Sequence, residues 1–179
     1  MNIRPNAFQR FLHRLLLPRP VSAFVAVVLH HVDALLLRLT NNRYTVTEFA
    51  GLPVLQLTTI GAKTGKQRKT MLVRLQEGEK ILQVGEKIAL IASNYGRAHN
   101  PGWYYNLKAN PECQVLFNEK SATYIAHEAE GEEREKYWQL ALSYYAGYEK
   151  YRARAVHRRI PVMVLKPKTK QDGFVARHP

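Results

Sequence analysis

Beyond residue 44 the chain alternates short apolar runs with glycine, asparagine and charged residues, a pattern typical of short β-strands joined by turns. Gly51, Gly78 and Gly85 separate several of these runs. The expected strands are residues 45–50, 53–60, 69–76, 79–84, 86–92, 113–118, 121–127 and 161–166. This series of short strands predicts a mostly antiparallel β-barrel.

Residues 131–147, between the last two expected strands, have the spacing of an amphipathic helix. The acidic residues near its positive N-terminal end are Glu132, Glu133 and Glu135. One face of the helix carries Tyr137, Ala141, Tyr144 and Tyr148. Aromatic residues on a helix belong more often to a core than to a pocket. Phenols close to a planar ligand would nevertheless suit a quinone or a nitroaromatic compound, so both interpretations stay open.

A shorter helix is expected at residues 102–109. Asn100 is a favourable N-cap, Pro101 suits the first helical position, and the pair Asn110-Pro111 ends the pattern. The side chains that this helix presents are Trp103, Tyr104, Asn106 and Leu107. An equally good interpretation makes Trp103 and Leu107, four residues apart, a pair that faces the core.

Residues 1–44 predict a basic, amphipathic helical extension. Its first apolar face ends where Pro18 and Pro20 break the helix. The apolar run at 21–29 is too short to span a membrane, and no small-residue cleavage pattern follows it, which argues against a signal peptide. Two helices lying on an anionic membrane surface fit this pattern. Helices packed on the protein's own core, or on a second subunit in a homodimer, fit it equally well.

The formal net charge of +13 is concentrated at the two ends. Residues 1–43 hold six arginines and one acidic residue, and residues 150–179 hold nine lysines or arginines and one acidic residue. Such ends suit anionic lipid or an acidic coenzyme tail. Because the chain lacks a recognisable nucleic-acid-binding module, we expect no nucleic-acid partner. Residues 168–179 are expected to form a basic C-terminal tail.

A length of 179 residues predicts one main domain. The single cysteine, Cys113, excludes an internal disulfide and favours a reducing compartment, so we expect a cytoplasmic protein, either free or peripheral at the inner face of the cell membrane. We expect Cys113 to be a small buried side chain. The histidines are scattered and lack ligand spacing, so no metal site is expected. No Gly-x-Ser-x-Gly sequence supports a hydrolase.

The stretch IGAKTGKQRKT at residues 60–70 combines glycine with cationic and hydroxyl side chains. Gly61 and Gly65 allow a tight turn that presents backbone N–H groups, and the surrounding charge favours an anionic ligand. A nucleotide P-loop is a poor match, because three residues separate the glycines and Gln67 follows Lys66. A solvated hairpin turn is the simpler alternative.

Three stretches together resemble a known family: LTTIGAKTGKQR at 57–68, ASNYGRAHNPGWYYNLKANP at 92–111 and RRIPVMVLKP at 158–167. In order and spacing they are similar to the nitroreductase family of deazaflavin-dependent oxidoreductases, which includes related quinone reductases. The resemblance covers residues 45–167. It implies an α+β fold with a mostly antiparallel split β-barrel of the FMN-binding split-barrel type, flanked by helices, that binds the deazaflavin coenzyme F420.

The resemblance also implies roles for individual residues. Lys63 and Thr64 would contact the phosphate and polyglutamate tail of the coenzyme. The strand beneath it would be lined by Arg68, Lys69, Thr70, Met71, Leu72 and Val73. Its ring and ribityl chain would be surrounded by Ile91, Ala92, Ser93, Asn94, Gly102, Trp103, Tyr104, Tyr105 and Asn106. Ser93 would lie near the reacting substrate, in a pocket formed by Tyr145, Tyr148 and Tyr151.

Three positions depart from the family pattern. Ala62 stands where a basic residue is frequent, Asn94 where lysine is common, and Val73 where tyrosine occurs. These departures concern the tail contacts and the substrate pocket more than the fold.

The implied activity is hydride transfer from reduced coenzyme F420 to a quinone, nitroaromatic or similar acceptor. Two alternatives use the same residues. A related barrel could bind FMN as a flavin reductase or carrier, since the cationic turn would accept a single phosphate equally well. A non-catalytic barrel could instead bind lipid or another apolar ligand.

Overall fold

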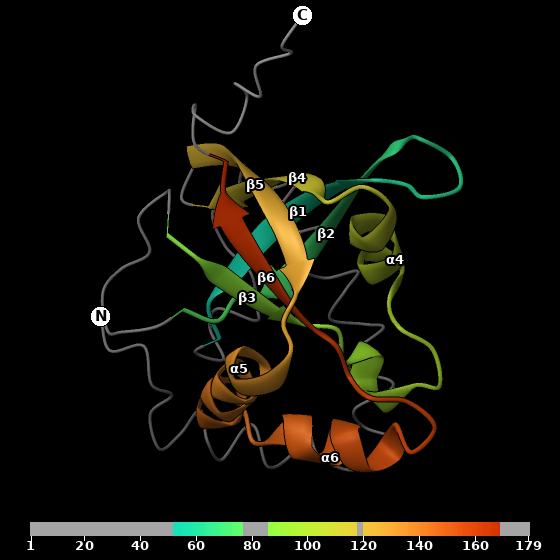
Figure 1. Ribbon diagram of the computed structural model, residues 1–179, viewed down its shortest axis with the longest axis vertical. Coiled ribbons are helices and arrows are strands. Elements are labelled where there is room, and N and C mark those ends of the chain that lie inside the picture. Colours follow the sequence, from blue (N-terminus) through green and yellow to red (C-terminus); the bar gives the residue numbers. More distant parts are fainter. Residues whose placement is uncertain (1–51, 77–85, 118–119, 169–179) are drawn as a thin grey trace, which may run out of the picture.

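The computed structural model describes residues 52–76, 86–117 and 120–168, in which six strands form one sheet (Figure 1). The strands are β1 (Val54–Ile60), β2 (Gln67–Val73), β3 (Ile88–Ile91), β4 (Glu112–Phe117), β5 (Lys120–Glu128) and β6 (Val162–Pro167). Their order is β2-β1-β4-β5-β6-β3, and every neighbouring pair is antiparallel. The helical elements are η1 (Asn94–Gly96), α4 (Gly102–Ala109), α5 (Gly131–Tyr144) and α6 (Gly147–Arg154).

The sheet curls until its two edge strands meet. Just beyond the end of β2, Leu75 forms an isolated antiparallel bridge with Ala89 of β3. The backbone N–H of each residue donates to the carbonyl of the other at 2.9 Å. The expected α+β fold with a mostly antiparallel split β-barrel is therefore confirmed for the described residues.

The alternation of side chains along β3 and β6 divides the interior into two cores. Ile88 and Leu90 face a cluster shared with β1, β4, β5 and α4, whereas Ala89 and Ile91 face a cluster shared with α5 and α6. β6 alternates in the same way, with Met163 and Leu165 in the first cluster and Val162 and Val164 in the second. Both strands are buried on both faces, which explains their nearly continuous apolar sequences. Figure 1 shows α5 and α6 together on one side of the curled sheet.

Most of the expected strands agree with the structure to within two residues. The expected strand at 69–76 instead begins at Gln67 and ends at Val73, and the expected strand at 86–92 is shorter, Ile88–Ile91. Cys113 is buried in the first core, as expected. Among the described residues, no helix is long and apolar enough to cross a bilayer. The expected strands at 45–50 and 79–84, the extension 1–44 and nearly all of the tail 168–179 lie outside the described residues.

The expectation of one helix over residues 131–147 is wrong. α5 ends at Tyr144, Tyr145 is extended (φ −152°, ψ 105°), and α6 begins at Gly147. The ring of Tyr145 lies so closely against Gly147 that a Cβ there would overlap its Cζ atom. The two helices are separated at Tyr145, where the extended backbone interrupts the helical conformation.

The N-cap role expected for Asn100 is also wrong. α4 follows Pro101, which takes the N-cap position without a side-chain hydrogen bond. The Asn100 Oδ1 atom instead accepts a hydrogen bond from Arg158 at 2.5 Å. A tertiary partner therefore displaces the local capping preference.

Candidate functional site

The cationic turn, residues 61–69, comprises the tight connection 61–66 between β1 and β2 and the first three residues of β2. The Gly61 N–H donates to the Lys66 carbonyl at 2.8 Å, and the Gly65 N–H donates to the Gly61 carbonyl at 2.8 Å. Gly65 has a left-handed backbone (φ +63°), and a Cβ on Gly61 would lie 2.7 Å from the Thr64 Oγ1 atom. Gly65 therefore suits the left-handed position of the turn, and Gly61 allows close approach of Thr64.

Four cationic side chains extend from this turn into solvent: Lys63, Lys66, Arg68 and Lys69. None of the four forms an ion pair with a carboxylate among the described residues. A cluster of uncompensated charge beside a tight backbone turn favours a ligand that carries phosphate or carboxylate groups.

α4 holds this turn through the side chain of Asn106. The Asn106 Oδ1 atom accepts from the Ala62 N–H at 3.0 Å, and its Nδ2 group donates to Thr59 Oγ1 at 3.0 Å. One helical turn later, the Asn110 Nδ2 group donates to the Ile60 carbonyl at 3.5 Å. The Asn106 amide is thus engaged within the protein at both ends, and it joins the helix to the cationic turn.

Several other residues expected near the coenzyme ring have buried side chains. Ile91 lies in the second core, while Ala92 and Trp103 lie in the first. Leu107 joins Trp103 there, so the core-facing interpretation of this pair is confirmed. Any coenzyme contact by Ile91 or Ala92 would therefore be made chiefly by backbone atoms.

The two remaining aromatic residues of α4 differ in exposure. Tyr104 donates from its hydroxyl to Glu128 Oε2 at 2.9 Å, and the Lys108 ammonium lies 3.1 Å from the same oxygen. Burial and the Glu128 carboxylate raise the pKa of Tyr104 to about 12. Tyr105 is 47% exposed and remains available to a ligand.

The β3–α4 loop, residues 92–100, has an unusual backbone. Ser93 is right-handed, but Asn94, Tyr95 and Gly96 follow with φ angles of 46°, 57° and 78°. Gly96 packs against α6, where a Cβ would lie 2.8 Å from the Tyr151 carbonyl oxygen. The Asn94 Nδ2 group donates to the His99 carbonyl at 2.9 Å. Runs of left-handed residues are costly and occur often at functional sites.

Tyr145, Tyr148 and Tyr151, expected to line a substrate pocket, lie together. Their ring centroids are 5.7 to 6.0 Å apart, and Tyr95 joins them with its ring 5.9 Å from that of Tyr151. We call these four residues the tyrosine cluster. Burial raises the pKa of Tyr148 and Tyr151, so both phenols remain protonated at neutral pH and can donate hydrogen bonds. Tyr95 connects the cluster to the loop that contains Ser93.

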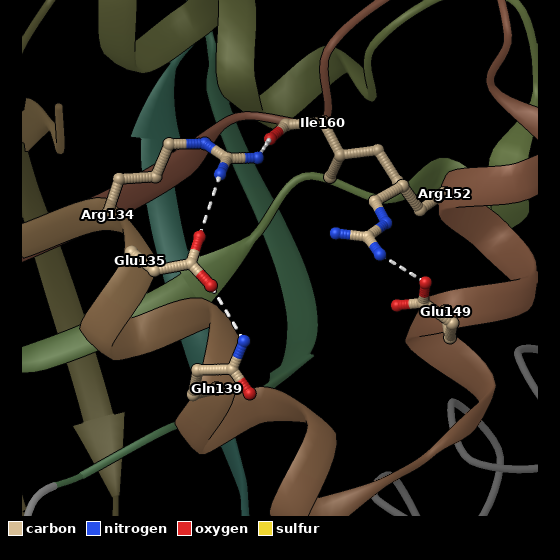
Figure 2. A network of polar contacts seen from close by, with 6 residues as sticks. All are labelled: Arg134, Glu135, Gln139, Glu149, Arg152 and Ile160. Carbon is tan, nitrogen blue, oxygen red and sulfur yellow. Dashed lines mark hydrogen bonds and ion pairs between the residues drawn. The ribbon is translucent and has the colours of Figure 1, made fainter. Parts of the chain in front are cut away.

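A polar network that includes none of the expected site residues is formed mainly by side chains of α5 and α6 (Figure 2). Arg134 donates to the Ile160 carbonyl at 3.2 Å, and Arg152 pairs with Glu149. The guanidinium carbons of both arginines lie about equally far from the Trp138 ring centre, at 5.4 and 5.5 Å. Burial lowers the pKa of Arg134. These contacts support the helix that carries Tyr148 and Tyr151.

A cavity of about 340 Å³ adjoins this network. Its charged lining residues are Glu128, Glu130, Arg134 and Arg159. Two acidic and two basic side chains leave it without a dominant charge, and it contains none of the residues expected to bind the coenzyme. The cationic turn, the β3–α4 loop and the tyrosine cluster are therefore the better candidate site.

Sequence reasoning missed two residues of this site. Tyr95 was not singled out, although its neighbours Ser93 and Asn94 were. Arg158 was noted only as part of the stretch at 158–167, yet its guanidinium group makes several contacts to the β3–α4 loop. The available signal for Arg158 was its place in this stretch, just before Pro161 and β6. The loop atoms that accept its hydrogen bonds are far away in sequence and cannot be inferred from spacing.

Known proteins resemble this chain in sequence. The family model for F420H(2)-dependent quinone reductases matches residues 32–167. An F420H(2)-dependent quinone reductase of Mycobacterium tuberculosis is 34% identical over 145 residues, which cover 75% of this chain and 92% of the relative.

Two solved structures extend the comparison to the fold. An F420-H2 dependent reductase (FDR-A) has a TM-score of 0.55 and 39% identity, over 64% of this chain and 94% of its own. A second structure, described as a domain-swapped dimer, has a TM-score of 0.57 and 33% identity, over 82% of this chain and 96% of its own. With the family match over residues 32–167, these similarities show that the chain belongs to the F420H(2)-dependent quinone reductase family.

Proposed function

We propose that this protein is an oxidoreductase that transfers a hydride from reduced coenzyme F420 to a quinone, nitroaromatic or similar electrophilic acceptor. The observation that carries the proposal is the cationic turn, where four exposed cations have no acidic partner among the described residues. The relatives named above are F420H(2)-dependent quinone reductases, which supports the same donor and a quinone acceptor.

The cationic and hydroxyl side chains of the turn suit an anionic coenzyme. Lys63, Thr64 and Arg68 would hold the phosphate and the acidic tail, while the exposed Lys69 adds charge at the start of β2. Along the rest of β2, Thr70, Met71, Leu72 and Val73 are partly buried and would lie beneath the planar ring. Ser93, Asn94, Gly102 and Tyr105 would approach the ring from the β3–α4 loop and α4.

Bound coenzyme F420 would supply the hydride in a two-electron step. The protein would orient the acceptor, exclude water and place a hydrogen-bond donor at the acceptor oxygen, where negative charge develops. Ser93 and the phenol hydroxyls of Tyr145, Tyr148 and Tyr151 are our candidates for these roles. Their support is the ring contacts within the tyrosine cluster and the link from Tyr95 to the loop.

The first experiment follows oxidation of chemically reduced coenzyme F420 by menadione, with NADPH and reduced FMN as alternative donors. We expect oxidation with coenzyme F420 alone. Oxidation of reduced FMN would favour the flavin reductase alternative. Tight FMN binding without turnover would favour a flavin carrier, and absence of any turnover or cofactor binding would favour a barrel for an apolar ligand.

Changing Ser93→Ala together with Tyr148→Phe should lower kcat for menadione about tenfold to a hundredfold, since each change removes a hydroxyl that could stabilise the acceptor oxygen. Coenzyme affinity should change less than threefold, as measured by fluorescence titration. Ser143→Ala is the control, because the Ser143 hydroxyl donates to the Leu140 carbonyl within α5 and is not among the proposed site residues. Full turnover by the double variant would remove both residues from the acceptor site.

We also propose that residues 1–43 bind an anionic membrane surface from the cytoplasmic side. The support is their composition of six arginines and one acidic residue, together with the apolar helical face that the sequence predicts. Full-length protein should sediment with vesicles that contain phosphatidylglycerol, and Arg10→Gln with Arg14→Gln should weaken this binding. Equal sedimentation with purely zwitterionic vesicles would contradict an electrostatic contact.

A homodimer is a further proposal. One similar solved structure is described as a domain-swapped dimer, and a second subunit could cover the apolar face that the sequence predicts for residues 1–44. Light scattering of the full chain gives the molar mass directly. A monomer over the micromolar range would contradict this proposal.

A further inference from the structure

Arg158, between α6 and β6, uses its guanidinium group to bind one loop at several points. Its Nη2 group donates to the Ser93 carbonyl at 2.7 Å, and its Nε group donates to the Arg97 carbonyl at 2.9 Å. Its Nη1 group donates to Asn100 Oδ1 at 2.5 Å and, at 3.4 Å, to the Ala92 carbonyl. The four acceptors span the β3–α4 loop from its first residue to its last.

The partners of Arg158 indicate a geometric role rather than charge pairing. Among the described residues its donors meet three backbone carbonyls and one amide oxygen, and no carboxylate. The side chain is partly buried, and burial lowers the pKa of the Arg158 guanidinium. A rigid fork of five N–H donors can reach several separated acceptors at once, which a lysine ammonium cannot do.

The loop needs such support because of its backbone. Asn94 and Tyr95 are left-handed residues other than glycine, and each costs about 1–2 kcal/mol relative to a right-handed conformation. Ser93 is right-handed (φ −66°, ψ −36°) and Asn94 is left-handed (φ 46°). Successive residues in this combination turn their N–H groups toward one side, a geometry that binds an oxygen with negative charge.

We propose that Arg158 is a positioning residue that fixes the β3–α4 loop and thereby sets the conformation of Ser93 and Asn94 at the coenzyme and acceptor site. The inference rests on the proposed function for its catalytic consequence. The loop-fixing part is independent of that function, because the contacts exist without a bound coenzyme. Arg158 acts through the backbone of the loop and touches neither reactant.

The test compares Arg158→Lys with Arg158→Ala in the full-length protein. Lysine keeps the positive charge but lacks the planar fork of N–H donors. If Arg158 positions the loop, Arg158→Lys should therefore show the same defects as Arg158→Ala. We expect both variants to show at least tenfold faster amide hydrogen exchange in residues 92–100 in coenzyme-free protein, with unchanged exchange in β4 and β5. For the reaction, we expect kcat with menadione to fall about tenfold or more in both, with little dependence on salt.

Two controls separate positioning from other effects. Arg159→Gln removes the adjacent, exposed cation and should change neither loop exchange nor kcat. Millimolar guanidinium chloride should restore part of the kcat of Arg158→Ala, whereas potassium chloride at the same ionic strength should not. This specific rescue would not follow from general destabilisation.

The outcomes are separable. Wild-type exchange rates in Arg158→Lys, or full activity in that variant, would overturn the proposal. Loss of activity with an unchanged loop would also overturn it and would point to a direct contact by Arg158. Faster loop exchange in a protein whose wild type never oxidises reduced coenzyme F420 would uphold loop fixing and refute the proposed function instead.

Discussion

Lys63→Met combined with Arg68→Met should weaken coenzyme F420 binding about a hundredfold at low salt, because two charge-assisted contacts to an anionic ligand are removed together. Neither side chain forms an ion pair with a described residue, so its charge is available to the ligand. Methionine keeps an apolar stem of similar length, and both positions are exposed, so stability should change little. Fluorescence titration of the coenzyme measures the dissociation constant.

The salt dependence provides the decisive control for this prediction. At an ionic strength of about 0.5 M, salt screening should reduce the difference in coenzyme affinity between the wild type and the double variant. Lys150→Met removes an exposed cation from α6, away from the turn, and should leave affinity unchanged. Unchanged affinity in the double variant at low salt would contradict the role of the cationic turn.

Gly96→Ala should lower the free energy of unfolding by about 3 kcal/mol, through left-handed strain plus a clash in a packed site. The new Cβ would lie 2.8 Å from the Tyr151 carbonyl oxygen and 2.7 Å from the Arg154 Cβ. Neither atom is the far end of a flexible side chain, so α6 would have to move. Urea unfolding followed by the fluorescence of Trp103 and Trp138 measures the loss.

Gly131→Ala is the matched control for Gly96→Ala. Gly131 is also left-handed (φ +51°), but no atom lies within 4 Å of the position that a Cβ would take there, so only backbone strain of about 1 kcal/mol is expected. Similar losses in the two variants would show that the contact between η1 and α6 adds nothing. A larger loss at Gly96, with slower menadione turnover, would show that α6 and the loop depend on each other.

Strands such as β1 were predictable because burial of one face imposes a period of two that sequence alone displays. In β1, for example, Leu55, Leu57 and Thr59 are all buried, and glycine marks the turn that follows. The break between α5 and α6 was not predictable in this way. The helical spacing of aromatic residues continues past Tyr144, but the backbone of Tyr145 is extended and the first helix ends there.

In the candidate site, too, local patterns were predictable and long-range contacts were not. The cationic turn was recognisable because its glycines and cations are adjacent in sequence, and the three tyrosines because they recur every third residue. Asn106 and Asn100 were assigned roles from local patterns, yet their amides contact Ala62 and Arg158, 44 and 58 residues away. Contacts over such separations depend on the fold, which single-sequence patterns do not specify.

The sharing of β3 and β6 between two cores has a consequence for how the molecule loses its structure. Neither core can melt while the other persists, since each would take the same two strands with it. The described residues should therefore behave as one cooperative unit. A ligand held at the cationic turn would then protect the second core, which includes α5 and α6, against unfolding as effectively as it protects its own binding residues.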